Sequence, residues 1–99
     1  MIRHCVFFTF QEEANGKTRQ ENLLEAQKLI LAMEGRIPGM LSIDCGLNFT
    51  IDDAAWDIAL FCTFETEEDL TTYQTHPIHQ EVVKFIRQVR DKRAVVDWR

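Results

Sequence analysis

Hydrophobic and polar residues follow a period of two in four segments of the chain, and each of these segments predicts a strand. Residues 2–10, IRHCVFFTF, are rich in aromatic and β-branched residues, and the polar cluster QEEANG ends the run. In residues 40–49, MLSIDCGLNF, apolar residues occupy every second position from Leu41 to Phe49. WDIALFCTFE (56–65) predicts a third strand, and AVVDW (94–98) predicts a fourth.

Two other segments have the period of a helix. Thr18 to Glu21 fits a capping box, and apolar residues then recur at spacings of three and four from Leu23 to Ile37. This predicts a helix of about five turns, ended by Gly35 and the Pro-Gly pair at 38–39.

The second helical segment begins at a further capping box, residues 66–69, and runs through Tyr73. Pro77 interrupts it, because proline disfavours helical geometry in the residue before it but fits the first turn of a new helix. The apolar stripe of that new helix runs from Ile78 to Val89. We therefore predict a helix that is broken at His76-Pro77.

The order β-α-β-β-α-β predicts one ferredoxin-like α+β domain over residues 1–99. Its four-stranded antiparallel sheet is expected to carry both helices on a single face. The opposite face of such a sheet alternates to polar residues if it meets water.

Here the predicted sheet is apolar on both faces. The first strand places Val6 and Phe8 on one side but Cys5 and Phe7 on the other, and in the third strand Leu60 likewise alternates with Phe61. A doubly apolar sheet with one helical layer needs a cover on its second face. Because most soluble oligomers are symmetric, we expect a homodimer with two sheets packed face to face.

Composition and charge limit the classes of molecule that the protein is expected to bind. The chain has 99 residues, 45% of them hydrophobic and 27% charged, which is typical of one compact soluble domain. A net charge of −5 disfavours a nucleic-acid partner. The basic residues near the end of the chain alternate with apolar positions, and we expect them to form the solvated face of a helix: Lys84, Arg87, Arg90, Lys92 and Arg93.

No segment predicts a membrane span, a disulfide framework or a metal site. No apolar run approaches the ~20 residues that cross a bilayer, and the first residues lack a small-residue cleavage site, so we expect a cytoplasmic protein. Cys5, Cys45 and Cys62 are far apart and form no CxxC motif. His76 and His79 have no carboxylate or thiol near them in the sequence to complete a metal site.

Five segments, in this order, resemble the stress-responsive A/B barrel (Dabb) domain family, a branch of the dimeric α+β barrel superfamily: MIRHCVFFTF, IPGM (37–40), WDIALFCTFE, YQTHPIHQEVVKFI (73–86) and VVDW. The His-Pro-x-His segment is the most specific of them. The resemblance implies a homodimer whose sheets enclose a central barrel.

The same segment has a more distant resemblance to olivetolic acid cyclase, an enzyme relative that folds a polyketide chain by an aldol-type condensation. The resemblance implies that His79 is a general base and that Tyr73 is a donor to the developing enolate, with His4 in the same pocket. His79 and Tyr73 are therefore the candidate catalytic residues. We expect the pocket to bind its ligand through His4, Phe8, Trp56 and Leu60.

Enzymatic and non-enzymatic functions are both compatible with these residues. In the first, the barrel binds a small apolar or polyketide-like molecule, with cyclase-type or lyase-type acid–base chemistry that needs no cofactor. In the second, a stress-related or structural oligomer has a barrel filled by its bulky aromatic side chains. A cofactor-independent monooxygenase is a third hypothesis. A cavity of about 300 Å³ or more beside Tyr73 and His79 favours the first.

Overall fold

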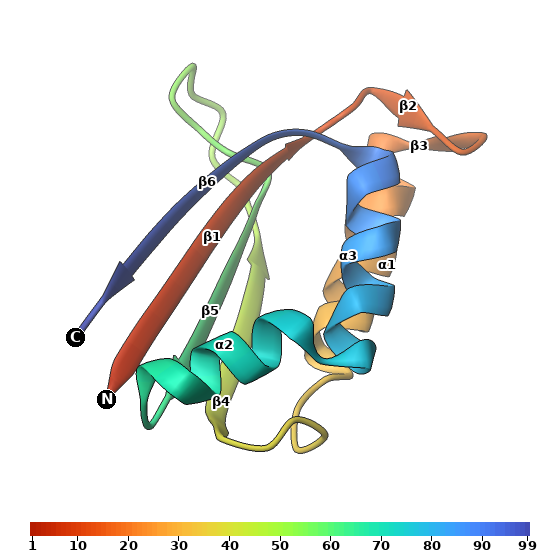
Figure 1. Cartoon of the computed structure of the whole chain (residues 1–99). Helices are drawn as coiled ribbons and strands as arrows, with labels where there is room; N and C mark the ends of the chain where they lie inside the picture. The colour runs from red at the N-terminus through yellow and green to blue at the C-terminus, as the bar shows by residue number, and fades with distance from the viewer.

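Four strands form one antiparallel sheet in the computed structural model, which describes all residues from 1 to 99 (Figure 1). The strand order is β4-β5-β1-β6. The strands span Met40–Leu47 (β4), Ile58–Phe64 (β5), Ile2–Phe10 (β1) and Arg90–Trp98 (β6). The first and last strands of the chain are therefore neighbours, as the ferredoxin-like pattern predicts.

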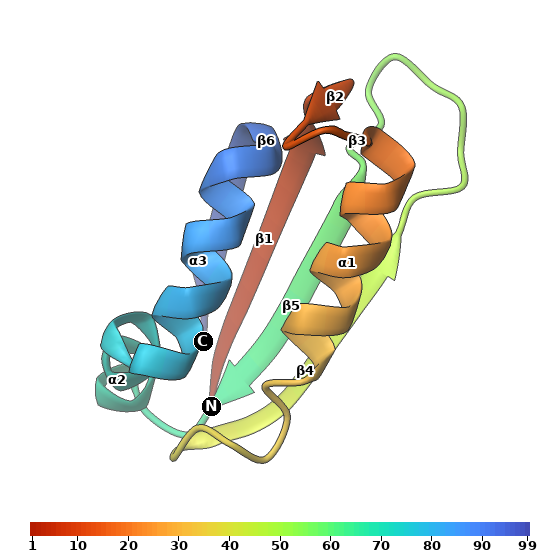
Figure 2. The ribbon, with the colours of Figure 1, turned by 90° about the vertical axis from the view of Figure 1, so that its right-hand side faces the viewer.

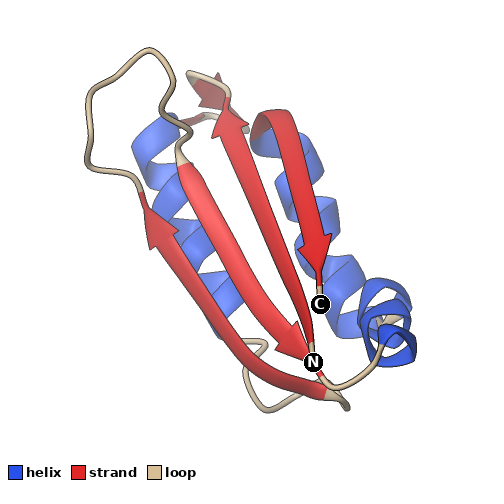
Figure 3. Ribbon diagram, turned by 90° about the vertical axis from the view of Figure 1, so that its left-hand side faces the viewer, coloured by secondary structure: helices blue, strands red, loops and turns tan.

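All three helices lie on the same side of this sheet. Helix α1 (Arg19–Leu31) and helix α3 (Pro77–Val89) run side by side across it, and the short α2 (Glu67–Thr75) lies at one end (Figure 2). The opposite face of the sheet carries no helix (Figure 3). The predicted α+β architecture is confirmed. No helix is long and apolar enough to cross a membrane.

The first helix starts where the capping box predicts and ends earlier than the apolar pattern predicts. The Glu21 amide donates to the Thr18 hydroxyl at 3.2 Å, and the Thr18 amide donates to the Glu21 carboxylate at 3.0 Å. The helix ends at Leu31. Met33 and Ile37 are buried all the same, because tight turns after the helix return them to the core. The prediction of a helix of about five turns was therefore wrong, because the helix is shorter.

A two-residue hairpin before α1 was not predicted. Strands β2 (Glu13–Ala14) and β3 (Lys17–Thr18) pair across Asn15 and Gly16, which have φ angles of 55° and 74°. Positive φ at both central residues is the geometry of a tight hairpin turn, which Asn-Gly favours. The polar cluster that ended the first strand is therefore partly ordered as strand.

The second predicted strand departs from its alternation at both ends. Ile43 and Cys45 are buried as expected, but the β4–β5 register shifts between Met40 and Ser42, and Leu41 is left 57% exposed. Phe49 lies beyond the last strand residue, in the loop before β5, and is 96% exposed. Period-two alternation does not extend past the end of a strand.

The core lies between the sheet and the helices. Alternate residues of β1 are buried against the helical layer, and β5 contributes Ile58, Leu60, Cys62 and Phe64 to the same layer. Phe7 and Phe61 project from the other face, so this face is apolar as well. The three cysteines are all free.

The predicted break between the last two helices is confirmed. His76 ends α2 in an extended conformation, and Pro77 is the first residue of α3. The Nδ1 atom of His76 accepts the amide hydrogen of Ile78 at 3.1 Å, so its side chain caps the new helix. Tyr73 and His79 thereby lie on the two sides of a sharp bend.

Candidate functional site

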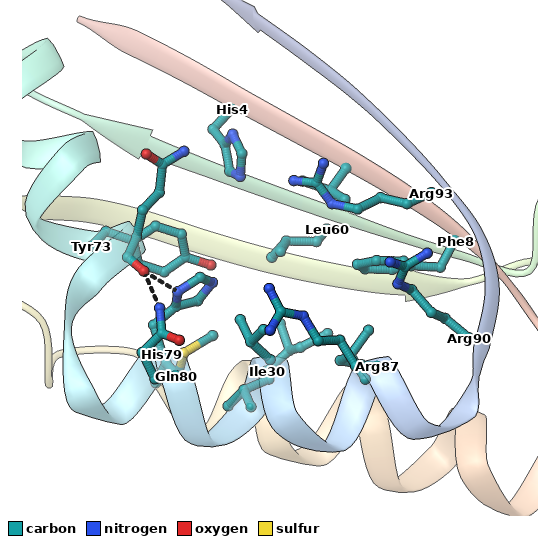
Figure 4. Close-up of a pocket in the computed structure, with 16 residues that line it drawn as sticks. His4, Phe8, Ile30, Leu60, Tyr73, His79, Gln80, Arg87, Arg90 and Arg93 are labelled. Carbon is teal, nitrogen blue, oxygen red and sulfur yellow. Dashed lines mark hydrogen bonds between the residues drawn. The ribbon is translucent and has the colours of Figure 1, made fainter. Parts of the chain in front are cut away.

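A cavity of about 400 Å³ lies between α3 and the helix-facing side of the sheet (Figure 4). We call it the α3 cavity. Nine of its sixteen lining residues are hydrophobic. Figure 4 shows the polar His79 and Gln80 at one end and Arg87 and Arg90 at the other. This volume and mixture are typical of small-molecule sites.

Tyr73 lies in the last part of α2 and is fully buried beside the cavity. Its hydroxyl group neighbours the Cys62 thiol but makes no hydrogen bond of ordinary geometry within the chain, and Figure 4 shows it directed toward the open space. Burial, with a smaller effect from the neighbouring Cys62 thiol, raises the pKa of Tyr73 far above its ordinary value. The hydroxyl is therefore a neutral donor at physiological pH.

His79 lies in the first turn of α3, and its ring centroid is 4.1 Å from that of Tyr73. Its Nδ1 atom is 3.2 Å from the Gln74 carbonyl oxygen. Because a carbonyl only accepts, Nδ1 carries the hydrogen, and Nε2 is left with a free lone pair. Figure 4 shows that this second nitrogen is directed into the cavity.

The surroundings of His79 favour its neutral form. Burial is the main cause that lowers the pKa of His79, and the Gln74 carbonyl opposes this by holding the ring hydrogen. The positive charges of His4, Arg93 and His76 lower the pKa further. The imidazole is therefore a free base at neutral pH.

His4 reaches the same end of the cavity from β1 and is 3% exposed. Its Nδ1 atom donates to the Asp97 carboxylate at 2.5 Å. Asp97 pairs with His4 in the β1–β6 register, so both side chains lie on the helix-facing side. The ring of His4 meets the edge of Tyr73 with centroids 6.0 Å apart. The carboxylate thus fixes the orientation of the ring.

The structure brings together five of the six residues that the sequence predicts for the site. Phe8 and Leu60 line the α3 cavity with His4, Tyr73 and His79. Trp56 does not. It precedes β5, and it lines a second, more open hollow of about 490 Å³ under the β4–β5 loop, together with Phe7, Gly46, Leu47, Asn48, Phe49, Ala54, Ile58 and Ala59.

The cavity also has a position that the sequence did not predict. We expected a pocket inside a barrel between two sheets, whereas the α3 cavity lies within one chain, between its own helix and its own sheet. The aromatic residues that were expected to fill the barrel divide between the two sides. Phe8, Phe10 and Phe64 are buried on the helical side, and Phe7 and Phe61 lie on the other.

Four charged residues in or next to the cavity were not predicted as part of a site. Three of them, Arg87, Arg90 and Arg93, line the α3 cavity. The expectation that the basic residues near the end of the chain form a solvated helix face was correct for the exposed Arg87 but wrong for Arg90 and Arg93, which lie on β6. Asp97 is the fourth, through its bond to His4. No three His, Cys, Asp or Glu side chains gather in a geometry that could hold a metal ion.

Comparison with known proteins yields a family and a set of related structures. The model of the stress responsive A/B barrel domain (Dabb) matches residues 2–99. A comparison with curated protein sequences finds no match.

Three solved structures are similar over nearly the whole chain. A dimeric, ferredoxin-like protein of unknown function from Bacteroides fragilis is 27% identical, with a TM-score of 0.85 over 98% of this chain and 93% of that one. A Dabb family protein from Mesorhizobium loti is 24% identical, with a TM-score of 0.68 over 99% and 94%. Hydroxynitrile lyase from Passiflora edulis is 19% identical, with a TM-score of 0.81 over 98% and 90%. These two less similar structures share the fold.

Proposed function

Starting from the finding that this chain belongs to the stress-responsive A/B barrel (Dabb) domain family, we propose that it forms a homodimer and that its α3 cavity binds a small apolar carbonyl compound. Side chains of the cavity transfer protons at the carbon beside the carbonyl. The chemistry is of the cyclase or lyase type and uses no cofactor. His79 is the base, and Tyr73 is the donor to the carbonyl oxygen.

The observation that carries this proposal is the unpartnered hydroxyl of Tyr73. A buried hydroxyl without a partner costs about 1–3 kcal/mol of desolvation, and native structures rarely leave such a group unsatisfied without a reason. The hydroxyl faces a cavity that is large enough for a ligand. A carbonyl oxygen of that ligand would supply the missing acceptor.

His79 supplies the second requirement of the reaction, a free base beside the donor. Its Nε2 lone pair takes the proton from the carbon next to the carbonyl, the electron pair of the broken C–H bond forms a C=C bond, and the π pair of the carbonyl moves onto its oxygen. The neutral Tyr73 hydroxyl stabilises this developing oxyanion. Return of the proton, or attack of the enolate on a second carbonyl, completes the step.

The uncovered face of the sheet supports the homodimer. Phe61, Val96 and Trp98 lie on this face and are partly or largely exposed. Phe49 and Ile51, in the β4–β5 loop, are almost fully exposed. A monomer rarely leaves so many large apolar side chains in water. The similar protein from Bacteroides fragilis is dimeric.

The volume of the cavity argues against a purely structural role. A stabilising oligomer with a filled interior has no need of a partly open cavity of about 400 Å³ between helix and sheet, because protein interiors are otherwise close-packed. The polar groups at one end of this space are oriented by neighbours, His79 by Gln74 and His4 by Asp97. Such orientation is typical of a site that acts on a ligand.

Proton exchange of octan-2-one in D₂O tests the proposal, because this ketone is apolar and exchanges slowly by itself. The protein is expected to accelerate deuterium incorporation beside the carbonyl, followed by NMR, by about 100-fold or more. His79→Gln should abolish the acceleration, and Lys84→Gln, on the exposed side of the same helix, should retain it. Equal rates for the protein and the His79→Gln variant would overturn the assigned base.

A further inference from the structure

Three arginines line the α3 cavity without a carboxylate partner. Arg87 lies in the last turn of α3, and Arg90 and Arg93 lie on β6. The chain has two ion pairs, His4–Asp97 and Arg99–Glu67, and neither involves these residues. No aspartate or glutamate is among the residues that line the cavity.

This cluster concentrates positive charge in an acidic chain. Sixteen acidic residues outnumber eleven basic ones, and only one of the seven arginines, Arg99, forms an ion pair with a carboxylate. What distinguishes the three arginines here is that they line one cavity that no carboxylate lines. Arg87 and Arg93 are exposed to solvent and Arg90 is half-buried, so water weakens the repulsion among the three guanidinium groups but does not remove it. A negatively charged ligand group would remove this repulsion.

A bulge in β6 is what turns two of the arginines toward the cavity. Phe8 pairs with Arg93 and Phe10 pairs with Arg90, so three steps along β6 match two steps along β1. Residues three apart in a regular strand project to opposite faces, but the extra residue restores Arg90 and Arg93 to the same face. Figure 4 shows their side chains over Phe8 and Leu60.

Arg87 completes the cluster from the helix. It lines the cavity from α3, while Arg90 and Arg93 line it from β6, just beyond the turn where the helix becomes the strand. In Figure 4 the Arg93 guanidinium reaches over Leu60 toward His4, while Arg87 rises from the helix below. The arginines thus surround the part of the cavity away from Tyr73.

We infer that the α3 cavity takes an apolar molecule that ends in an oxyanion, a carboxylate or a phosphate monoester, and that Arg87, Arg90 and Arg93 bind this end. The planar guanidinium group donates two parallel hydrogen bonds to either oxyanion. The apolar middle of the ligand lies against residues such as Phe8, Leu60 and Ile86. The inference rests on the proposed function and adds the charge of its substrate.

The positions of Tyr73 and His79 determine the orientation of the ligand in the cavity. With its oxyanion at the arginines, the molecule presents its other part to the donor and the base. The positive charge of Arg93 is close enough to both residues to lower the pKa of each slightly, against the much larger effect of burial. A substrate that combines a carbonyl group with a distant oxyanion therefore fits both ends.

Calorimetric titration with three eight-carbon probes tests the inference. Octanoate and octyl phosphate carry the two oxyanions, and octanamide has the shape of octanoate without its charge. We expect at least one anion to bind about tenfold or more tightly than octanamide, the equivalent of 1.4 kcal/mol. The preferred anion identifies the oxyanion, and its affinity should fall as salt is added.

Substitution of the arginines shows whether they are the residues that bind the anion. Arg87→Gln, Arg90→Gln and Arg93→Gln should each reduce anion affinity several-fold and leave octanamide affinity unchanged. Lys84→Gln on α3 and Lys92→Gln on β6 remove the same charge from neighbouring positions that do not line the cavity, and they should retain anion binding.

Each outcome separates this inference from the proposed function. Equal affinity for anions and octanamide, or equal losses in the lysine and arginine variants, would overturn the inference while octan-2-one exchange continues to support the proposed function. If no eight-carbon probe binds and octan-2-one exchange is also absent, the proposed function fails, and the inference fails with it.

Discussion

The rings of Tyr73 and His79 lie with their centroids 4.1 Å apart, although one residue belongs to α2 and the other to α3. In an unbroken helix, residues six apart are turned by about 240° around the axis and lie on different faces. The bend at His76-Pro77 is therefore what brings the proposed donor and base to one cavity.

Removing the bend should separate the two residues. In the double variant His76→Ala/Pro77→Ala, α2 and α3 are expected to merge, because both the cap and the helix-breaking proline are lost. Helical circular dichroism should rise, and octan-2-one exchange should fall to the level of buffer. His76→Asn, which keeps a capping side chain and the proline, is the control. Undiminished exchange in the double variant would show that the bend has no role.

Tyr73→Phe should weaken function without weakening the fold. The substitution removes a buried hydroxyl that has no partner, so its desolvation cost disappears and the free energy of unfolding should stay equal or rise by up to about 1 kcal/mol. Octan-2-one exchange should fall by about 100-fold, as expected for loss of an oxyanion donor. Urea unfolding together with the exchange assay checks both. A large loss of stability would indicate a structural hydrogen bond instead.

The fold could be predicted from the sequence wherever a local rule decides the structure. The alternation in β1 and β5 predicted which residues share a face of the sheet, and the capping boxes predicted where α1 and α2 begin. The end of α1 could not be predicted in this way, because Met33 and Ile37 continue the helical spacing and are buried, although they lie in the turns that follow the helix. The exposed Leu41 depends on a register shift that no local pattern reveals.

The candidate site could be predicted only in part. Tyr73, His79 and His4 came from the resemblance to a family, and the structure brings them to one cavity. Asp97 could not be predicted, since its contact with His4 joins the two ends of the chain through the β1–β6 register. Arg90 and Arg93 were missed because the fourth strand was predicted to begin at residue 94 and these two residues were assigned to a helix. In the structure β6 begins at Arg90, and a bulge turns both residues to the cavity side.

The pKa of His79 gives the protein and its reaction a pH dependence. Burial lowers this pKa below its ordinary value of 6.5, so below about pH 6.5 the unfolded chain binds more protons than the folded one. The contribution of His79 to stability is complete above pH 6.5, falls as the pH decreases, and is gone below the lowered pKa.

The His79→Gln variant isolates this contribution. Its free energy of unfolding should vary less steeply than that of the original protein between about pH 5 and pH 7. The octan-2-one exchange rate of the original protein should rise with pH to a plateau, with a midpoint below 6.5. Parallel stability curves for the two proteins, measured by urea unfolding, would contradict the assignment.

The uncovered face of the sheet should form the interface of the proposed dimer. Phe61→Asp introduces a charge where its ring lies 6.0 Å from that of Trp98, and it should weaken the proposed dimer by at least about 100-fold. Light scattering at micromolar concentration should then detect monomers. Leu24→Asp, at an exposed apolar position on α1, is the matched control and should remain dimeric. A Phe61→Asp protein that stays dimeric would place the interface elsewhere.

A crystal structure of the protein soaked with octan-2-one tests the central claim most directly. We predict that the ketone occupies the α3 cavity, with its carbonyl oxygen about 2.7 Å from the Tyr73 hydroxyl and its neighbouring carbon facing His79 Nε2. A ketone found only between two sheets, or an α3 cavity that remains closed to it at saturating concentration, would contradict the account.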